Sequence, residues 1–252
     1  MNVQNKKITI IIPRAVDVSL YFSATVAKYA KNGWKIVAII TTSENHENEK
    51  HELAASGKII GLAHAYFLKY KTGSLKQAGS DNPKMDIYEI FQEEKPDVIL
   101  TVARHGFSQN PDTTTTAIAV ILAYEKYIKN IIPEFPDAIP TSSHVIPAMQ
   151  LPIPKLYFFT FPEQFLKFIQ SKGFLRKDAA GFNFEGTPDK KITHVLDVKN
   201  FVKQKIETLR IHKSAQIETS RMIELLKTYK SSHIDYFMKY PLVETDKISN
   251  RF

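Results

Sequence analysis

The stretch KITIIIPRAVDVSL, residues 7–20, decides the fold of this chain. It begins with an apolar, β-branched run that Pro13 ends, which is typical of a short buried strand. A charged pair, Arg14 and Asp17, follows at once, and apolar residues then recur at helical spacing. A buried strand, a polar loop and an amphipathic helix, in that order, are the first half of a βαβ unit.

The same alternation continues along the chain. Apolar runs bounded by Gly, Pro or Asn predict strands, and apolar residues at helical spacing predict the helices between them. Strands are predicted over residues 7–12, 34–42, 65–69, 96–103 and 156–161, helices over 18–32, 47–60, 85–94, 111–129 and, as one helix or two, 198–229, and loops over 70–84 and 130–154. This order predicts a Rossmann-like α/β fold, whose mostly parallel sheet has helices on both faces.

The chain of 252 residues is expected to form a single α/β domain. Its core is predicted over residues 7–170, and a helical C-terminal part over about 198–240. The proline-rich loop 130–154 is long for a compact domain, and such loops are often functional.

Composition and charge narrow the classes of function. The absence of cysteine excludes disulfides and thiolate metal ligands, and favours a reducing compartment. The formal net charge is +8, but the lysines are spread along the whole chain, which disfavours nucleic acid as a partner. The first apolar run is too short for a signal peptide or a membrane span. A cytoplasmic protein without a membrane partner is expected, and the oligomeric state stays open.

Three polar loops follow the carboxyl ends of predicted strands. They run from Arg14 to Asp17, from Thr41 to Glu44 and from Arg104 to Thr113. Ligands of open α/β sheets bind at this end of the strands. We therefore expect the three loops to meet in one cleft.

Six stretches carry a resemblance to a known family. They are KITIIIPRAVDV (residues 7–18), TTSE (41–44), ELAASGKIIG (52–61), PDVILT (96–101), NPDT (110–113) and HKSAQ (212–216). Their order resembles that of the LmbE-like family, also called the PIG-L type de-N-acetylases. That family shows a strand with A-H-P-D-D-E, then T-x-G-E, E-x-x-A-x-x-x-L-G, P-D-V-V-x-T, H-P-D-H and H-x-S-Q. The resemblance implies the fold of zinc hydrolases that remove acetyl groups from N-acetylglucosamine units and related amides.

The chain departs from the family pattern where the resemblance implies catalysis. The family's first zinc ligand falls on Arg14, its general base on Val16, its second ligand on Asp17 and its third on Thr113. A guanidinium stays protonated and has no electron pair for zinc, and a valine accepts no proton. No metal is therefore expected. We expect Arg14 to fill the vacated space and to pair with Asp17, so that a fixed cation replaces a metal cation.

Three functions stay open. The first is a non-catalytic homologue, a pseudoenzyme, that binds a sugar, another amide-bearing small molecule or a protein partner without zinc. The second is an active metal-dependent N-deacetylase with rearranged ligands, for which His105, Asp112, Asp17 and His144 are candidates. The third is a basic binding module for anionic polymers.

The pocket has a predicted lining but no predicted catalytic residue. The expected ligand-binding residues are Arg14, Asp17, Arg104, His105, Asn110, Asp112 and Thr113. A plainer interpretation of the Arg14–Asp17 pair is a loop salt bridge that caps the following helix. His212 has a plainer interpretation too, as a packed histidine.

Overall fold

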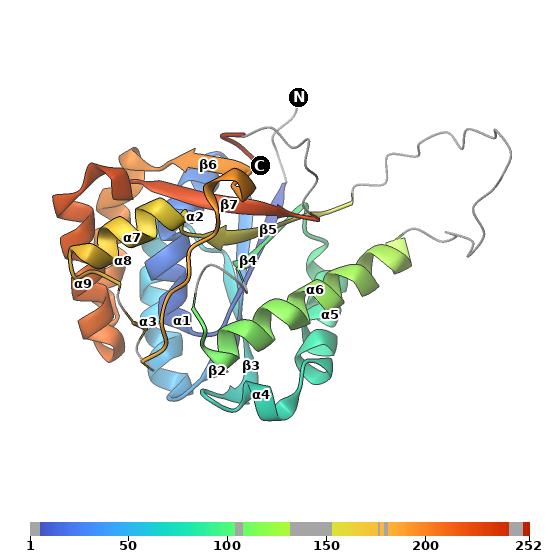
Figure 1. The fold of residues 1–252 in the computed structure, drawn as a ribbon. Coiled ribbons are helices and arrows are strands. Elements are labelled where there is room, and N and C mark those ends of the chain that lie inside the picture. Colours follow the sequence, from blue (N-terminus) through green and yellow to red (C-terminus); the bar gives the residue numbers. More distant parts are fainter. Residues whose placement is uncertain (1–5, 104–107, 132–152, 176, 179–180, 242–248) are drawn as a thin grey trace, which may run out of the picture.

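A seven-stranded sheet lies at the centre of the described structure (Figure 1). The computed structural model describes residues 6–103, 108–131, 153–175, 177–178, 181–241 and 249–252. The strands are β1 (Lys7–Ile12), β2 (Lys35–Ser43), β3 (His64–Lys71), β4 (Val98–Val102), β5 (Lys155–Thr160), β6 (His194–Asp197) and β7 (Ile234–Tyr240), in the order β3-β2-β1-β4-β5-β7-β6. Strands β1 to β5 are parallel, and β7 runs antiparallel to both β5 and β6. The predicted mostly parallel α/β fold is confirmed.

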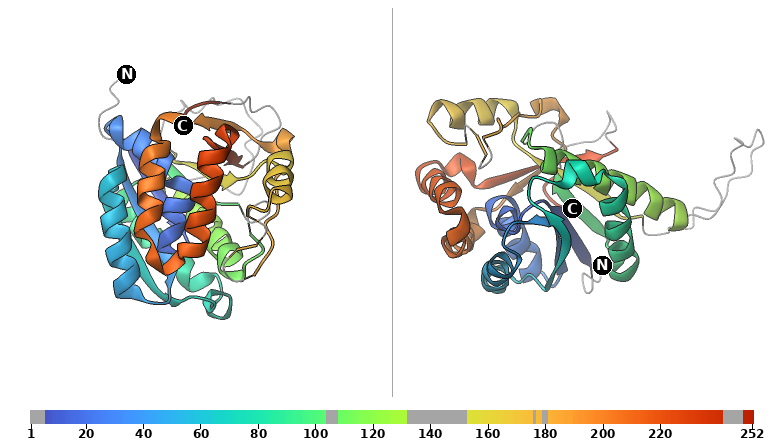
Figure 2. Two further views of the ribbon diagram at one scale, coloured as in Figure 1. Left: turned by 90° about the vertical axis from the view of Figure 1, so that its left-hand side faces the viewer. Right: turned by 90° about the horizontal axis from the view of Figure 1, so that it is seen from below.

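Helices cover both faces of the sheet (Figure 2). They are α1 (Ala15–Asp17), α2 (Ser23–Lys31), α3 (His46–Ile60), α4 (Leu75–Ala78), α5 (Asp81–Glu94), α6 (Pro111–Ile131), α7 (Glu163–Ser171), α8 (Val202–Ile211) and α9 (Gln216–Thr228), with a π-helical turn, η1 (Val18–Phe22), between α1 and α2. Helices α2, α3, α8 and α9 pack together on one face, and α4, α5 and α6 pack together on the other. Among the described residues, none of the helices has the length and apolarity that a membrane crossing requires.

The centre of the sheet forms the core. Ile10, Ile11 and Ile12 of β1 have no exposed surface, since β2 and β4 flank this strand and helices cover both of its faces. A parallel strand buried on both faces needs apolar side chains at successive positions, which the run of isoleucines supplies. The strand predicted first from the sequence is therefore an interior strand of the sheet, between β2 and β4.

The predicted helical C-terminal part is wrong at its end. Residues 198–229 do hold two helices, α8 and α9, but Ile234–Tyr240 form strand β7 between β5 and β6. Its backbone pairs with β5, about 80 residues earlier in the chain. A pattern read along the chain does not show that partner, because the pairing is long-range.

The predicted loop 70–84 is also partly wrong, since it holds α4 and the first residues of α5. The buried carboxylate of Asp112, on α6, accepts hydrogen bonds from the backbone N–H groups of Gly73 (2.6 Å) and Leu75 (3.1 Å). This tertiary contact fixes the turn before α4. Most of the predicted loop 130–154 lies outside the described residues.

Gly61 provides a test of the packing between α3 and α2. It ends α3 with a φ of +76°, and a Cβ atom there would lie 2.8 Å from the Cβ of Ala30. We expect Gly61→Ala to lower the free energy of unfolding by at least about 1 kcal/mol more than Gly33→Ala. Gly33 has a similar φ of +82° with no atom near its Cβ position, so its variant reports the backbone strain alone. Equal losses in urea unfolding would contradict the predicted clash.

Candidate functional site

The site begins where β1 ends. The carbonyl of Pro13 accepts hydrogen bonds from the backbone N–H (2.8 Å) and the hydroxyl (3.0 Å) of Thr42, which fixes the opening loop against the end of β2. The N–H of Arg14 donates to Asp17 Oδ2 (3.1 Å), and the N–H of Asp17 donates to the carbonyl of Arg14 (3.0 Å). The loop therefore caps α1, as the plainer interpretation of this pair predicts.

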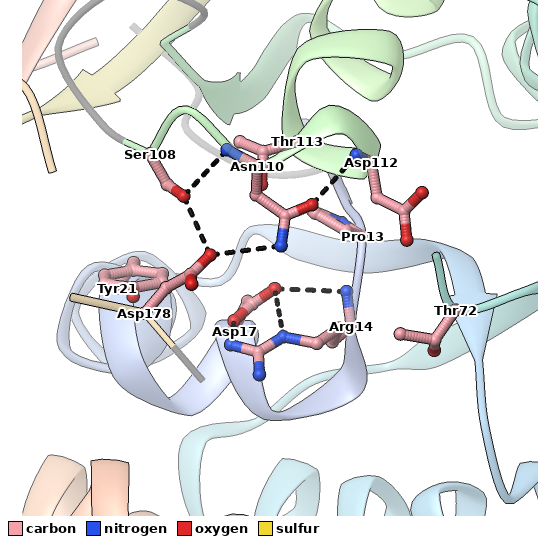
Figure 3. A pocket seen from close by; sticks show the side chains of 10 residues that line it. All are labelled: Pro13, Arg14, Asp17, Tyr21, Thr72, Ser108, Asn110, Asp112, Thr113 and Asp178. Carbon is pink, nitrogen blue, oxygen red and sulfur yellow. Dashed lines mark hydrogen bonds and ion pairs between the residues drawn. The ribbon is translucent and has the colours of Figure 1, made fainter. Parts of the chain in front are cut away.

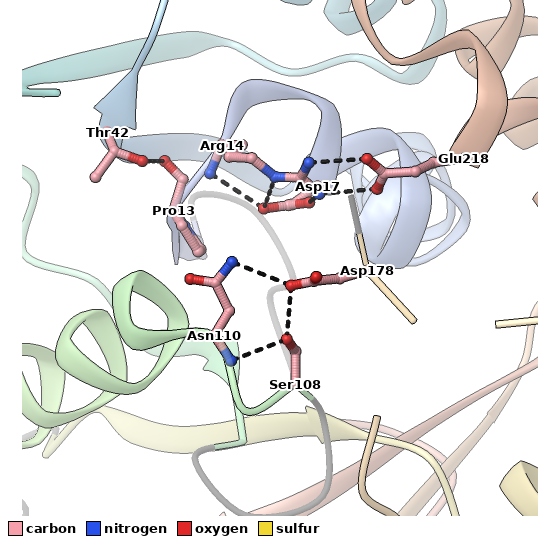
Figure 4. Close-up of polar contacts among 8 residues, drawn as sticks. All are labelled: Pro13, Arg14, Asp17, Thr42, Ser108, Asn110, Asp178 and Glu218. Atoms are coloured by element: carbon pink, nitrogen blue, oxygen red, sulfur yellow. Dashed lines mark hydrogen bonds and ion pairs between the residues drawn. The ribbon is translucent and has the colours of Figure 1, made fainter. Parts of the chain in front are cut away.

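The guanidinium of Arg14 lies between two carboxylates (Figure 4). It donates to Asp17 Oδ1 (2.8 Å) and Oδ2 (3.4 Å), and to Glu218 Oε1 and Oε2 (both 2.9 Å). The expected ion pair between Arg14 and Asp17 is present. Glu218 of α9, 204 positions later in the sequence, forms a second ion pair with Arg14. No feature of the sequence indicated Glu218, because its contact depends on how α9 packs.

Burial and charge act against each other in this cluster. Burial lowers the pKa of Arg14, but Asp17 and Glu218 together outweigh it and hold that pKa well above its ordinary value. Burial raises the pKa of Asp17, and Arg14 opposes the change. Arg14 therefore stays charged, and most of its N–H groups already donate to this chain's own carboxylates.

Asn110 and Asp178 form the opposite wall of the site (Figure 3). Asp178 Oδ2 accepts hydrogen bonds from Asn110 Nδ2 (3.0 Å) and from the hydroxyl of Ser108 (2.9 Å). Asn110 Oδ1 accepts from the N–H of Asp112 (2.9 Å), so Asn110 caps the start of α6. Asp178 comes from the segment after α7, where no pattern in the sequence indicated a site residue.

Some of the expected lining residues meet, and others lie outside the described part of the chain. Arg14, Asp17, Asn110, Asp112 and Thr113 surround one small cavity. The carboxylate of Asp112 is engaged with the turn before α4, as described above. The residues outside the described part are Arg104, His105 and His144.

Two cavities of very different size flank Arg14. The one that contains all three family ligand positions measures about 20 Å³, which is room for about one water molecule. The other measures about 280 Å³ and is called the Glu52 cavity below. Its lining includes Arg14, Val16, Glu44, Glu49, Glu52, Asn110, Ser214 and Glu218. Described residues of all three predicted polar loops line this cavity, namely Arg14, Glu44 and Asn110.

A polar network around the buried Glu52 and His212 supports the wall of the Glu52 cavity. Glu52 of α3 accepts hydrogen bonds from the N–H (3.1 Å) and the hydroxyl (2.5 Å) of Ser214. His212, only 1% exposed, lies behind Glu52 with its Nδ1 3.5 Å from Oε2, and its Nε2 is 2.8 Å from the hydroxyl of Ser19. Burial lowers the pKa of His212, and Glu52 opposes the change. His212 is thus a packed histidine, and Glu52 is the member of this network that lines the cavity.

Among the described residues, the structure has no group of three His, Asp or Glu side chains that could hold a metal ion. Two of the positions that the resemblance assigns to metal ligands are described by their contacts or side-chain type. Asp17 is engaged with Arg14, and Thr113 offers a hydroxyl where the resemblance places a histidine.

Comparison with known proteins gives a family match over part of the chain. Residues 10–124 match the family model "PIG-L: GlcNAc-PI de-N-acetylase". A relative from Saccharopolyspora erythraea, 1D-myo-inositol 2-acetamido-2-deoxy-alpha-D-glucopyranoside deacetylase 2, is 29% identical over 140 residues. That match covers 55% of this chain and 44% of the relative, so the chain spans less than half of the relative's length.

Solved structures share the fold at low sequence identity. The conserved protein TT1542 from Thermus thermophilus has a TM-score of 0.64 at 13% identity, covering 94% of this chain and 95% of that chain. N,N'-diacetylchitobiose deacetylase from Pyrococcus horikoshii has a TM-score of 0.60 at 14% identity, covering 94% and 84%. GalB, the 4-carboxy-2-hydroxymuconate hydratase from Pseudomonas putida, has a TM-score of 0.60 at 11% identity, covering 93% and 96%. One fold therefore occurs with two kinds of named activity.

Removing the central cation tests the ion cluster. We expect Arg14→Ala to lower the free energy of unfolding by about 3 kcal/mol, because Asp17 and Glu218 would remain largely buried without a counter-charge. Lys167→Ala, which breaks an exposed pair with Glu163, is the control and should cost less than about 1 kcal/mol. Urea unfolding measures both variants. A loss for Arg14→Ala as small as that of the control would show that the cluster adds little stability.

The lowered pKa of His212 predicts a pH dependence of stability. The unfolded chain binds a proton at His212 more readily than the folded chain does. The contribution of His212 is therefore full above the ordinary imidazole pKa of about 6.5 and is lost as the pH falls below it. We expect His212→Asn to flatten the fall in unfolding free energy between about pH 7.5 and 5.5. The exposed His51→Asn is the control, and an unchanged slope in His212→Asn would contradict the prediction.

Proposed function

We propose that this chain, whose residues 10–124 match the PIG-L family model, binds a polar small molecule beside Arg14 without zinc and without hydrolysing it. One observation carries the proposal. The guanidinium of Arg14 stands at the family's first ligand position and is already paired with Asp17 and Glu218.

The residues at the family ligand positions do not fit zinc. A catalytic zinc needs three protein ligands and one open position, and only Asp17 of the three positions carries a usual ligand group. The guanidinium of Arg14 has no electron pair for zinc, so it cannot stand in for the first ligand. The space between these positions is about 20 Å³ and already adjoins the charge of Arg14. We therefore assign no reaction step to a metal.

The binding role rests on the polar lining of the cleft. The Glu52 cavity, at about 280 Å³, has a volume close to that of pockets for small molecules. Its lining combines carboxylates, the amide of Asn110 and the hydroxyl of Ser214 with the apolar Val16. Such a surface suits a sugar or another amide-bearing compound, and the matched relative is named as a deacetylase of an acetamido sugar. Val16 stands where the resemblance places the general base, so this position lacks that carboxylate.

A second candidate is an N-deacetylase with rearranged ligands. The 29% identity over 140 residues to a named deacetylase favours it. It would need donors from outside the described residues, such as His105, since the described ones contain no set of three. The net charge of +8 favours the third candidate, a binding module for anionic polymers. The described lining of the Glu52 cavity disfavours it, because most of its charged side chains are carboxylates.

Zinc content separates the two leading candidates. We expect untagged protein, purified without chelator, loaded with zinc and then dialysed, to retain no stoichiometric zinc in elemental analysis. The matched control is the triple variant Arg14→His, Val16→Asp, Thr113→His, which restores the donor types that the resemblance implies. We expect this variant to retain zinc after the same dialysis.

The outcomes separate clearly. Stoichiometric zinc in the unmodified chain, lost in His105→Ala, would overturn the zinc-free proposal and support rearranged ligands. A chain without zinc that still releases acetate from N-acetylglucosamine would overturn the non-hydrolytic part of the proposal.

A further inference from the structure

Strand β3 forms one edge of the sheet, and among the described residues it pairs with β2 alone. The N–H of Ala63, just before the strand, donates to the carbonyl of Ile36 on β2 (2.8 Å). Successive residues of a strand direct their N–H and C=O groups to opposite sides. Those of His64, Tyr66 and Leu68 therefore point away from β2. Such a row of backbone groups is a template for a further strand.

The second half of β3 is protected against such pairing, and the first half is open. The register against β2 shifts after Phe67, and the exposed Lys69 and Lys71 follow. Bulges and lysines are means by which proteins protect edge strands from pairing with other chains. Residues 64–68 carry neither a lysine nor a register shift, so this segment is the open part of the edge.

Helix α5 places an acidic stripe along the same edge. Asp86, Glu89 and Glu93 recur at helical spacing and share one face of the helix. That face adjoins β3, because Tyr70 donates to Asp86 Oδ2 (2.7 Å) and Tyr66 donates to Glu93 Oε1 (3.1 Å). Among the described residues, no cation forms an ion pair with these three carboxylates. The stripe is therefore negative in a chain whose formal net charge is +8.

The opposite face of the edge is mainly apolar. The ring of Phe67 packs edge-on against His46 of α3, with 4.9 Å between the ring centroids. Ala65 lies two residues earlier on the same face and is half-buried. Side chains alternate between the two faces of a strand. An added strand would therefore present every second side chain to the acidic stripe and the others to Ala65 and Phe67.

We propose that residues 64–68 of β3 and the acidic stripe of α5 bind an extended segment of a partner protein, in which basic and apolar residues alternate, as an additional strand of the sheet. The outward N–H and C=O groups of β3 supply the strand pairing. The basic side chains of the partner meet the carboxylates of the stripe and the rings of Tyr66 and Tyr70. Its apolar side chains pack on the other face.

Charge disfavours a second copy of this chain as the added strand. If β3 paired with its own copy about a twofold axis, the two α5 helices would lie on the same face of the joined sheet. Their acidic stripes would then adjoin, and like charges repel each other. A cationic segment instead complements the stripe.

A labelled peptide of alternating lysine and valine, capped at both ends, tests this surface. We expect it to bind the unmodified chain at low ionic strength about tenfold more tightly than a glutamate–valine peptide of the same length, in fluorescence anisotropy. Bound peptide should slow amide hydrogen exchange at His64, Tyr66 and Leu68. Exchange at Ala65 and Phe67 should stay unchanged, because their N–H groups already face β2.

Variants separate the charge of the stripe from the pairing of the strand. Glu89→Lys should weaken binding of the lysine–valine peptide about fivefold, whereas Glu224→Lys, exposed on α9 across the sheet, is the control and should have no effect. His64→Pro removes an outward N–H at the first residue of β3, where proline costs no internal hydrogen bond. It should weaken binding several-fold more than His64→Ala, and urea unfolding would show that each variant is folded.

Each contrary outcome removes a defined part of the proposal. Equal binding of the two peptides, or binding that Glu89→Lys leaves unchanged, would overturn the basic partner. Binding without slower exchange at the three outward amides would overturn strand addition. Slower exchange at those amides without peptide, increasing with protein concentration, would assign the edge to a second copy and overturn the proposed partner. Failure of both peptides to bind would overturn the whole proposal.

Discussion

The guanidinium of Arg14, held between Asp17 and Glu218, is the contact on which the arrangement of the functional end depends. It joins the loop after the interior strand β1 to helix α9, and its two ends are 204 positions apart in the sequence. The contact also divides the space at the strand ends into a narrow cavity and the larger Glu52 cavity. Because all three groups are largely buried, each one needs the others to offset its cost of desolvation.

This arrangement changes what the site can hold. A metal ion supplies positive charge together with exchangeable coordination positions, whereas a guanidinium supplies the charge alone, in a fixed plane. Asp17 accepts hydrogen bonds from Arg14, and the proposed zinc-free function rests on this engagement of the carboxylate. Open space and spare carboxylates lie on the other side of Arg14, toward Glu52.

The fold itself is compatible with more than one chemistry. Structures that share it at low identity include a named deacetylase and a named hydratase. The architecture brings polar loops to the carboxyl ends of parallel strands, and the residues on those loops decide the activity. In this chain Arg14 and Val16 replace the groups that the resemblance implies, so the function must be argued from the site and not from the fold.

The sequence by itself determined the features that depend on neighbours along the chain. The isoleucine run of β1 shows in its composition, Asn110 caps α6 through its own backbone, and Arg14 meets Asp17 three residues away. Only the tertiary structure decided the contacts between distant segments. Strand β7 inserts beside β5, and Glu218 reaches Arg14. Glu52 in the same way meets Ser214 and His212. The local periodicity of the sequence does not predict such partners, because their contacts form only when the helices pack on the sheet.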